Sequence, residues 1–220
     1  NGILFNGPPV LPLPDPAPVI SGPLVYGEVP FTDLNYTCAE EIKLLVRSAV
    51  AGIAPALSEI IDVTFNDPVQ VGFAVEPSAT ATAAVAFEQQ PVAAVQDLYS
   101  NTVKTENTAV VTLSRGNKGS DILYGTTLTL PVTDGEAEFS GLYYNKAQTM
   151  NIKVVSDNLS YNEGFSRDIL VKVGPAVKVE LVGTTEIVAG QPYAVTLFAR
   201  DAGGNASNVI EDTVFGLSVS

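Results

Sequence analysis

The stretch QPVAAVQDLYSNTV, residues 90–103, decides the expected fold, because a similar stretch returns near the other end of the chain. There, residues 191–207 read QPYAVTLFARDAGGNAS. Each stretch runs from Gln-Pro through an apolar segment into a turn that begins with Asp and ends with Asn. Asp201 follows Asp97 after 104 positions, and the two Gln-Pro pairs are 101 positions apart. A period of this length indicates tandem structural units.

Short apolar or alternating runs surround these stretches, and turn residues separate them. The runs lie at about residues 69–75, 91–97, 108–114, 127–133, 136–140, 149–156 and 166–173. Asp134-Gly135, between two of the runs, is a strong signal for a tight hairpin. Such a series of short Val- and Thr-rich strands predicts a β-sandwich. After Gly174-Pro175 the pattern restarts, with further strands expected at residues 176–182, 192–201 and 213–220.

Several segments of the chain also resemble a known protein family. Four segments resemble the bacterial Ig-like, or Big-type, repeat of large cell-surface proteins: AVEPSATATAAVAFEQQPVAAVQDLYSNTV, DGEAEFSGLYYNKAQTMNIKVVSDN, VKVGPAVKVELVG and EIVAGQPYAVTLFARDAGGN. The resemblance covers about residues 69–220. It implies a complete Ig-like sandwich over residues 67–174 and an incomplete one over 175–220. Repeats of this class serve as spacers, stalks, S-layer building blocks, filament or adhesin segments, and parts of phage virions.

The incomplete second sandwich leaves two explanations open. Three strands cannot close a sandwich, and an open one exposes its sheet edges. Either the natural chain continues beyond residue 220, or a neighbouring subunit supplies the missing strands, as in strand addition between subunits.

The first 30 residues predict an extended arm. Seven prolines lie in GPPVLPLPDPAPVISGP, and proline favours a polyproline-like conformation. The arm is apolar enough to lie on its own domains or on a neighbour, and it is a candidate assembly arm through Ile3, Leu4, Phe5, Val19 and Ile20. Its prolines argue against a role as a long donor strand, because proline cannot donate to a ladder.

Residues 31–66 predict a small helical element. Thr37 and Glu40 have the spacing of a capping box, and apolar residues from Ile42 onward recur at helical spacing within residues 36–61. Gly52 and Pro55 then interrupt the pattern, so the helix is expected to end near residue 53.

Composition excludes several classes of function. The chain of 220 residues carries a formal charge of −13, which disfavours binding to nucleic acid or to anionic membranes. It contains no His, so a Ser-His-Asp or Cys-His centre is excluded, and its single cysteine, Cys38, cannot form an internal disulfide. The absence of Trp argues against a sugar-stacking platform. No apolar run reaches the roughly 18 residues that a membrane span needs.

Oxygen-rich loops give the remaining candidate sites. Asp97, Asn101, Asp201, Asn205 and Asp157 are weak candidates for calcium, which prefers carboxylate and amide oxygens, although Asp and Asn also form such turns by bonding their own backbone. Asn35, Asn158 and Asn205 begin glycosylation sequons. We expect no catalytic residue, and no cofactor other than calcium.

These observations predict a structural, non-enzymatic protein. We expect a mainly β, extracellular subunit or segment of an S-layer, filament or stalk that assembles with copies of itself through its arm and open strand edges. The alternatives are a phage virion decoration or fibre protein anchored through residues 1–66, with other surface or virion proteins as partners, and an adhesin or binding module.

Overall fold

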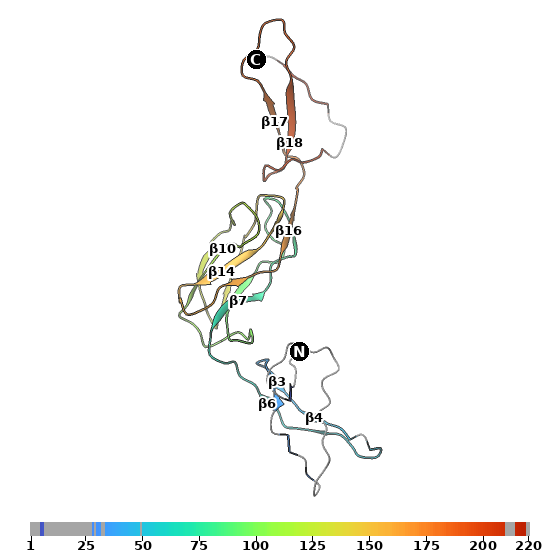
Figure 1. The fold of residues 1–220 in the computed structure, drawn as a ribbon, viewed down its shortest axis with the longest axis vertical. Coiled ribbons are helices and arrows are strands. Elements are labelled where there is room, and N and C mark those ends of the chain that lie inside the picture. The colour runs from blue at the N-terminus through green and yellow to red at the C-terminus, as the bar shows by residue number, and fades with distance from the viewer. Residues whose placement is uncertain are drawn as a thin grey trace.

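The computed structural model describes residues 28, 30–31, 34–48, 50–209 and 214–218, together with the backbone of residues 5–6. This part of the chain is mainly β, with several small sheets, and it contains no helix. The prediction of a mainly β protein is therefore confirmed. Figure 1 shows that the sheets follow one another along the long axis of the molecule, with the largest body in the middle.

Three sheets form this middle body, which we call the central unit (residues 67–174). The first contains β12 (Glu136–Glu138), β9 (Val92–Gln96) and β7 (Gln70–Val75). The second contains β11 (Thr129–Pro131), β10 (Val110–Arg115), β14 (Ile152–Ser156) and β15 (Gly164–Phe165). The third contains β13 (Thr149–Met150), β16 (Ile169–Lys172) and β8 (Thr80–Thr82), with β8 parallel to β16. Most predicted strands form, whereas β8 and β15 lie where the sequence predicts none.

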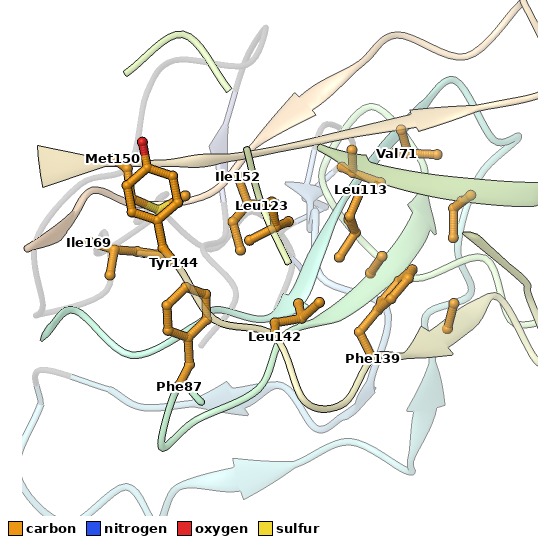
Figure 2. Close-up of a cluster of buried hydrophobic side chains, with 14 of the residues drawn as sticks. Val71, Phe87, Leu113, Leu123, Phe139, Leu142, Tyr144, Met150, Ile152 and Ile169 are labelled. Atoms are coloured by element: carbon orange, nitrogen blue, oxygen red, sulfur yellow. The ribbon is translucent and has the colours of Figure 1, made fainter. Parts of the chain in front are cut away.

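The three sheets share one hydrophobic core, shown at close range in Figure 2. Alternation along the strands produces it, because successive side chains of a strand point to opposite faces. In β10, Val111 and Leu113 are buried, and in β16, Ile169 and Val171 are buried while Leu170 between them is exposed. The largest side chains around them include Phe87, Phe139, Leu142, Tyr144, Met150 and Ile152.

The predicted hairpin turn at Asp134-Gly135 is confirmed. Asp134 has φ 51° and Gly135 has φ 77°, and two positive dihedrals in a row are typical of a type I′ turn. Thr133 and Glu136 exchange both backbone hydrogen bonds, at 2.8 and 3.0 Å. The flanking strands β11 and β12 belong to different sheets, so the turn carries the chain from one sheet to another.

Gly135→Ala is expected to lower the free energy of unfolding by about 1–3 kcal/mol. Its new Cβ would collide with the backbone carbonyl of Val103, and the positive φ would be strained as well. Urea unfolding measures the effect. Asp134→Gly is the matched control in the same turn, since it removes atoms from a position with positive φ and should change stability by no more than about 0.5 kcal/mol. Equal effects of the two changes would contradict this account of the turn.

The helix predicted from residue 36 to about residue 53 is wrong. The structure forms four short strands there: β3 (Glu41–Ile42), β4 (Leu45–Val46), β5 (Ala56–Leu57) and β6 (Ile61–Asp62). β3 pairs with β6 and β4 with β5, so the segment turns back on itself around Gly52, whose φ is +90°. The capping-box and helical spacings are local signals, and they are overridden here by pairing between residues 10 to 21 positions apart.

This N-terminal segment repeats the last strands of the central unit, with each residue n matched by residue n + 108. Glu41 pairs with Asp62 as Thr149 pairs with Leu170, and Val46 pairs with Ala56 as Val154 pairs with Gly164. We therefore call residues 34–66 the preceding unit. It contains only part of the pattern that the central unit shows complete.

Side-chain hydrogen bonds repeat with the same shift. The Ser58 hydroxyl accepts from the Leu44 N–H and donates to the Glu59 carbonyl, at 2.9 and 2.7 Å. Ser166, 108 positions later, makes the equivalent bonds with Ile152 and Arg167 at 2.9 and 2.8 Å. Pairing register and side-chain bonds agree, so the two segments have the same local structure.

A third copy of the pattern begins after the central unit. β17 (Lys178–Gly183) and β18 (Val195–Arg200) form an antiparallel hairpin in which Lys178 pairs with Arg200. The equivalent pair of β7 and β9 is Gln70 with Gln96. We call residues 175–209 the following unit. The strand predicted at residues 213–220 is not formed by residues 214–218, the part of it that the structure describes.

The predicted N-terminal arm lies mostly outside the described residues. This applies to Ile3, Leu4, Val19 and Ile20. Phe5 belongs to β1 (Phe5–Asn6), which pairs with β2 (Leu34–Asn35) of the preceding unit. The domain boundaries after residues 30, 66 and 174 stay predictions.

Candidate functional site: the joints between units

We call the contact between two successive units a joint. The first joint, between the preceding and the central unit, is built around Asp97, a buried carboxylate that directly follows β9. Its Oδ1 accepts from the backbone N–H groups of Tyr99 and Asn101, both at 2.9 Å. Its Oδ2 accepts from the Asn101 amide at 2.9 Å and from the Asn66 N–H at 3.0 Å. Because Asn66 is the last residue of the preceding unit, this carboxylate fixes the linker that enters the central unit.

Asn101 connects the same turn to the preceding unit. Its Nδ2 donates to the carbonyl of Thr37, and its Oδ1 accepts from the N–H of Ala39, both at 2.9 Å. A side-chain amide that bonds a backbone carbonyl and N–H two residues apart fixes both the position and the orientation of that segment. Asp97 and Asn101 together therefore hold the linker and the adjoining unit.

The second joint is built in the same way around Asp201, which is also fully buried. Its Oδ1 accepts from the Asn205 N–H at 2.8 Å, and its Oδ2 accepts from the Gly174 N–H at 2.9 Å. The Asn205 amide approaches both carboxylate oxygens, at 3.1 and 3.0 Å. Ser207 adds a bond from its hydroxyl to the Gly174 carbonyl at 2.7 Å.

Asn205 reaches back to the central unit as Asn101 reaches back to the preceding unit. Its Nδ2 donates to the Asn145 carbonyl at 2.7 Å, and its Oδ1 accepts from the Ala147 N–H at 2.9 Å. The contacted residues Asn145, Ala147 and Gly174 follow their counterparts in the first joint by 108 positions. The two joints are thus the same structure, made twice in one chain.

The backbone of both turns is fixed by their own hydrogen bonds. The N–H of Asp97 donates to the carbonyl of Asn101, and the N–H of Asp201 donates to that of Asn205, each at 3.0 Å. The fourth residue of each turn, Ser100 or Gly204, has a positive φ, 67° and 83° respectively. The glycine accommodates this conformation without strain, whereas the serine has a side chain in a region that L-residues rarely adopt.

Hydrogen bonding keeps both joint carboxylates ionised. Burial raises the pKa of Asp97, but bonds from the Asn101 side chain and from the backbone of Asn66, Asn101 and Tyr99 outweigh it, so the pKa lies below its usual value. Burial likewise raises the pKa of Asp201. The N–H of Gly174 and the bonds from Asn205 outweigh this effect and lower the pKa of Asp201. Each anion is therefore held by N–H donors alone.

This geometry does not favour the calcium hypothesis for the two turns. N–H groups of the protein surround the carboxylates of Asp97 and Asp201, while a calcium ion needs oxygen ligands. The Oδ1 atoms of Asn101 and Asn205 likewise accept hydrogen bonds from N–H groups. Asp157 accepts from the Val110 N–H at 2.9 Å. Among the residues that the structure describes, no group of three or more acidic or cysteine side chains is placed to hold a metal ion.

The three sequons differ in their surroundings. Asn158 is exposed, and its Oδ1 accepts from the Ser160 N–H at 3.0 Å. Asn35 is half-buried in β2. The amide of Asn205 is occupied by the second joint, so a glycan on its Nδ2 would have to displace the bond to Asn145.

Glu106 is a structural residue of the central unit that the sequence does not predict. Its Oε1 accepts from the hydroxyl and N–H of Thr108, at 2.6 and 2.7 Å, and from the N–H of Ala109 at 3.1 Å. Its Oε2 accepts from the Tyr161 hydroxyl at 2.8 Å. The bonds from Thr108 are the main reason that the pKa of Glu106 is lowered to about 2. The carboxylate caps the loop before β10 and joins it to the loop before β15.

Acid is expected to destabilise the protein through these carboxylates. Because the pKa of Glu106 is about 2 in the folded state and near 4.5 in the unfolded state, the unfolded chain binds more protons between those values. The stabilisation from Glu106 is therefore complete above pH 4.5 and is lost as the pH falls towards 2. Melting temperatures between pH 7 and pH 2.5 measure this loss. Glu106→Gln should flatten the profile, and an unchanged profile would contradict the assignment.

The remaining residues of the joints also escape a reading of the sequence. Thr37, Ala39, Asn145 and Ala147 contribute backbone groups, which carry no signature of their own. One signal is the shared spacing of Phe, Leu, Tyr and Ala, in FTDLNYTCA at residues 31–39 and FSGLYYNKA at residues 139–147. This shared spacing indicates that residues 31–39 repeat residues 139–147 of the central unit.

No protein-family model matches the chain, and a search of the curated proteins finds no match. Within the described residues, no helix has the length and apolar character needed to cross a membrane.

Proposed function

We propose that this chain is a structural segment of an extracellular surface assembly, such as an S-layer, filament or stalk, built from tandem Ig-like modules. The observation that carries the proposal is the repetition of one joint: the Asp97–Asn101 turn and the Asp201–Asn205 turn make equivalent bonds to equivalent residues of successive units. A chain that repeats both its units and their connections can extend indefinitely with constant geometry.

The Ig-like assignment is supported by the arrangement of the central unit. Antiparallel strands from the sheets of β7 and β10 contribute to one core, and Tyr144 lies buried within it with its hydroxyl bonded to backbone. A buried tyrosine of this kind is common in Ig-like sandwiches. The assignment describes architecture, and the function rests on the joints.

The joints suit a mechanical role. Units joined by a flexible linker move independently by default. In the first joint the N–H of the linker residue Asn66 donates to a buried carboxylate, and in the second joint the N–H of Gly174 does the same. In each joint an asparagine side chain also holds the neighbouring unit. Each joint therefore restricts rotation of one unit against the next. The net charge of −13 gives the outside of such an assembly a strongly solvated surface.

The repeat also bears on the virion alternative. Anchoring through residues 1–66 would call for a structure different from the other units, whereas residues 34–66 have the pairing register of the central unit. This observation favours a spacer over a specialised anchor.

Electron microscopy of the native material, with the mass of the intact chain measured beside it, tests the proposal. We expect ordered fibres or lattices at the cell surface with a repeat that matches the length of a unit. Native material that contains dispersed monomers, or particles with the symmetry of a virus, would contradict it.

A further inference from the structure

We propose, on the basis of the extracellular role above, that Asn158 carries an N-linked oligosaccharide. The residue begins the sequon Asn158-Leu159-Ser160, which lies in the loop between β14 and β15. A glycosyltransferase attaches the glycan to the side-chain nitrogen from a glycosyl diphosphate donor. The extracellular location comes from the proposed function, and the position of the glycan comes from the loop itself.

The acceptor lies on a loop of the central unit, whose strands close around one core. Residues 157–160 are all exposed, and the Leu159 side chain beside the acceptor is 96% exposed. N-linked glycans are bulky and solubilising, and they belong on surface loops. A glycan on Asn158 would also cover this exposed leucine.

The preceding unit meets the central unit at a different place. It bonds to Asp97 and Asn101 through Thr37, Ala39 and Asn66. These three residues are the counterparts, 108 positions earlier, of the residues through which the central unit bonds to the following unit. A complete preceding unit is therefore expected to meet the central unit at this same turn, which leaves the sequon loop open to a transferase.

Hydrogen bonds hold the acceptor amide in one orientation. The Oδ1 of Asn158 accepts from the Ser160 N–H at 3.0 Å, and the Asn158 N–H donates to the Ser156 hydroxyl at 3.1 Å. The Tyr161 N–H donates to the Asn158 carbonyl at 3.1 Å and closes the turn. Because Oδ1 and Nδ2 branch from one planar carbon, the bond to Oδ1 directs Nδ2 away from the backbone of Ser160.

The attachment is a substitution at the Asn158 amide that leaves one of its two hydrogens in place. A bond forms from Nδ2 to the anomeric carbon of the sugar, and the bond from that carbon to the diphosphate oxygen breaks. Nδ2 gives up one proton as the diphosphate leaves. The remaining hydrogen is available for the bond between the Asn158 side chain and the Tyr161 hydroxyl. The loop can therefore keep its side-chain bonds after the glycan is attached.

The other two sequons do not offer an equivalent acceptor. Nδ2 of Asn205 donates to the Asn145 carbonyl at 2.7 Å and to the buried carboxylate of the second joint, so a glycan would replace a hydrogen that this joint uses. Asn35 is half-buried in β2 and pairs with Phe5 of β1. The structure thus favours Asn158 over both.

Site-resolved mass spectrometry of the native material tests the proposal. Trypsin cleaves after Lys and Arg, so it places the three sequons on separate peptides, and the peptide with Asn158 spans residues 154–167. We expect the majority of these peptides to carry a sugar on Asn158, and the peptides with Asn35 and Asn205 to carry none. A majority of unmodified Asn158, or a glycan on either of the other sequons, would overturn the proposal.

Two variants made in the organism that produces the chain test the chemistry. Ser160→Ala removes the hydroxyl of the sequon and leaves Asn158 in place, so we expect the glycan to disappear from the intact mass. Ser160→Thr is the matched control, because threonine also completes a sequon and should retain the glycan. A glycan that persists in Ser160→Ala, or that is lost from Ser160→Thr, would contradict an N-linked glycan at this site.

Electron microscopy of the same material separates the glycan from the structural function. Fibres or lattices built from chains without the glycan would overturn the modification and leave the structural function in place. A glycan on Asn158 in material that contains dispersed monomers would support the modification and contradict the structural function.

Discussion

Replacing Asp97 by alanine is expected to lower the free energy of unfolding by about 3–5 kcal/mol. The change removes an ionised, buried acceptor and leaves donors of Asn66, Tyr99 and Asn101 without their partner. Bonds to a charged group contribute more than neutral ones, and unsatisfied buried donors add a further cost. The loss should be accompanied by release of the linker at Asn66.

Urea unfolding of Asp97→Ala and of Asp67→Ala tests this expectation. Asp67 is an exposed carboxylate directly after Asn66, so its removal takes the same charge from the same joint without removing the buried acceptor. We expect Asp67→Ala to change stability by no more than about 0.5 kcal/mol. A loss below about 1 kcal/mol for Asp97→Ala would contradict the role of the carboxylate in the joint.

Tyr144→Phe is expected to destabilise the central unit by about 2–4 kcal/mol, although it removes one oxygen atom alone. The Tyr144 side chain is completely buried, and its hydroxyl oxygen accepts from the N–H groups of Ser120 and Asp121 at 2.9 and 2.7 Å. The Gln148 amide donates to the same oxygen at 2.7 Å. Phenylalanine would keep the packing and leave these donors without an acceptor.

The neighbouring tyrosine provides the control for this change. Tyr143 is half-buried and stacks on Tyr124 with ring centroids 5.0 Å apart. Tyr143→Phe preserves that stacking, so we expect thermal unfolding to shift by no more than the equivalent of about 0.5 kcal/mol. Equal shifts for the two variants would show that the hydroxyl of Tyr144 is not a structural acceptor.

Much of the central unit could be predicted from the sequence, because its signals are local. Short apolar runs between turn residues mark β10 and β16, and Asp134-Gly135 marks its turn. The short strands β8 and β15 carry no such pattern, since they are defined by their partners β16 and β14. Their existence follows from tertiary pairing, which a window of neighbouring residues does not contain.

In the N-terminal segment, by contrast, the local signals predict the wrong structure. Thr37, Glu40 and the apolar residues after them satisfy local criteria for a helix. The decisive information is non-local: the segment repeats the register of residues 149–170, and the backbone of Thr37 and Ala39 is held by Asn101, more than 60 positions away. The turns at Asp97 and Asp201 could be predicted from their repeated sequence. Their hydrogen-bond partners, which are distant in the sequence, could not.

Native-state hydrogen exchange at the joint amides tests the central claim most directly. Ala39, Asn66, Ala147 and Gly174 donate their N–H groups to the two joints. The account predicts that all four amides are protected, that Asp97→Ala releases Asn66 and Ala39, and that Asp201→Ala releases Gly174 and Ala147. Exchange of these amides at the rate of an unstructured chain in the wild-type protein would contradict it.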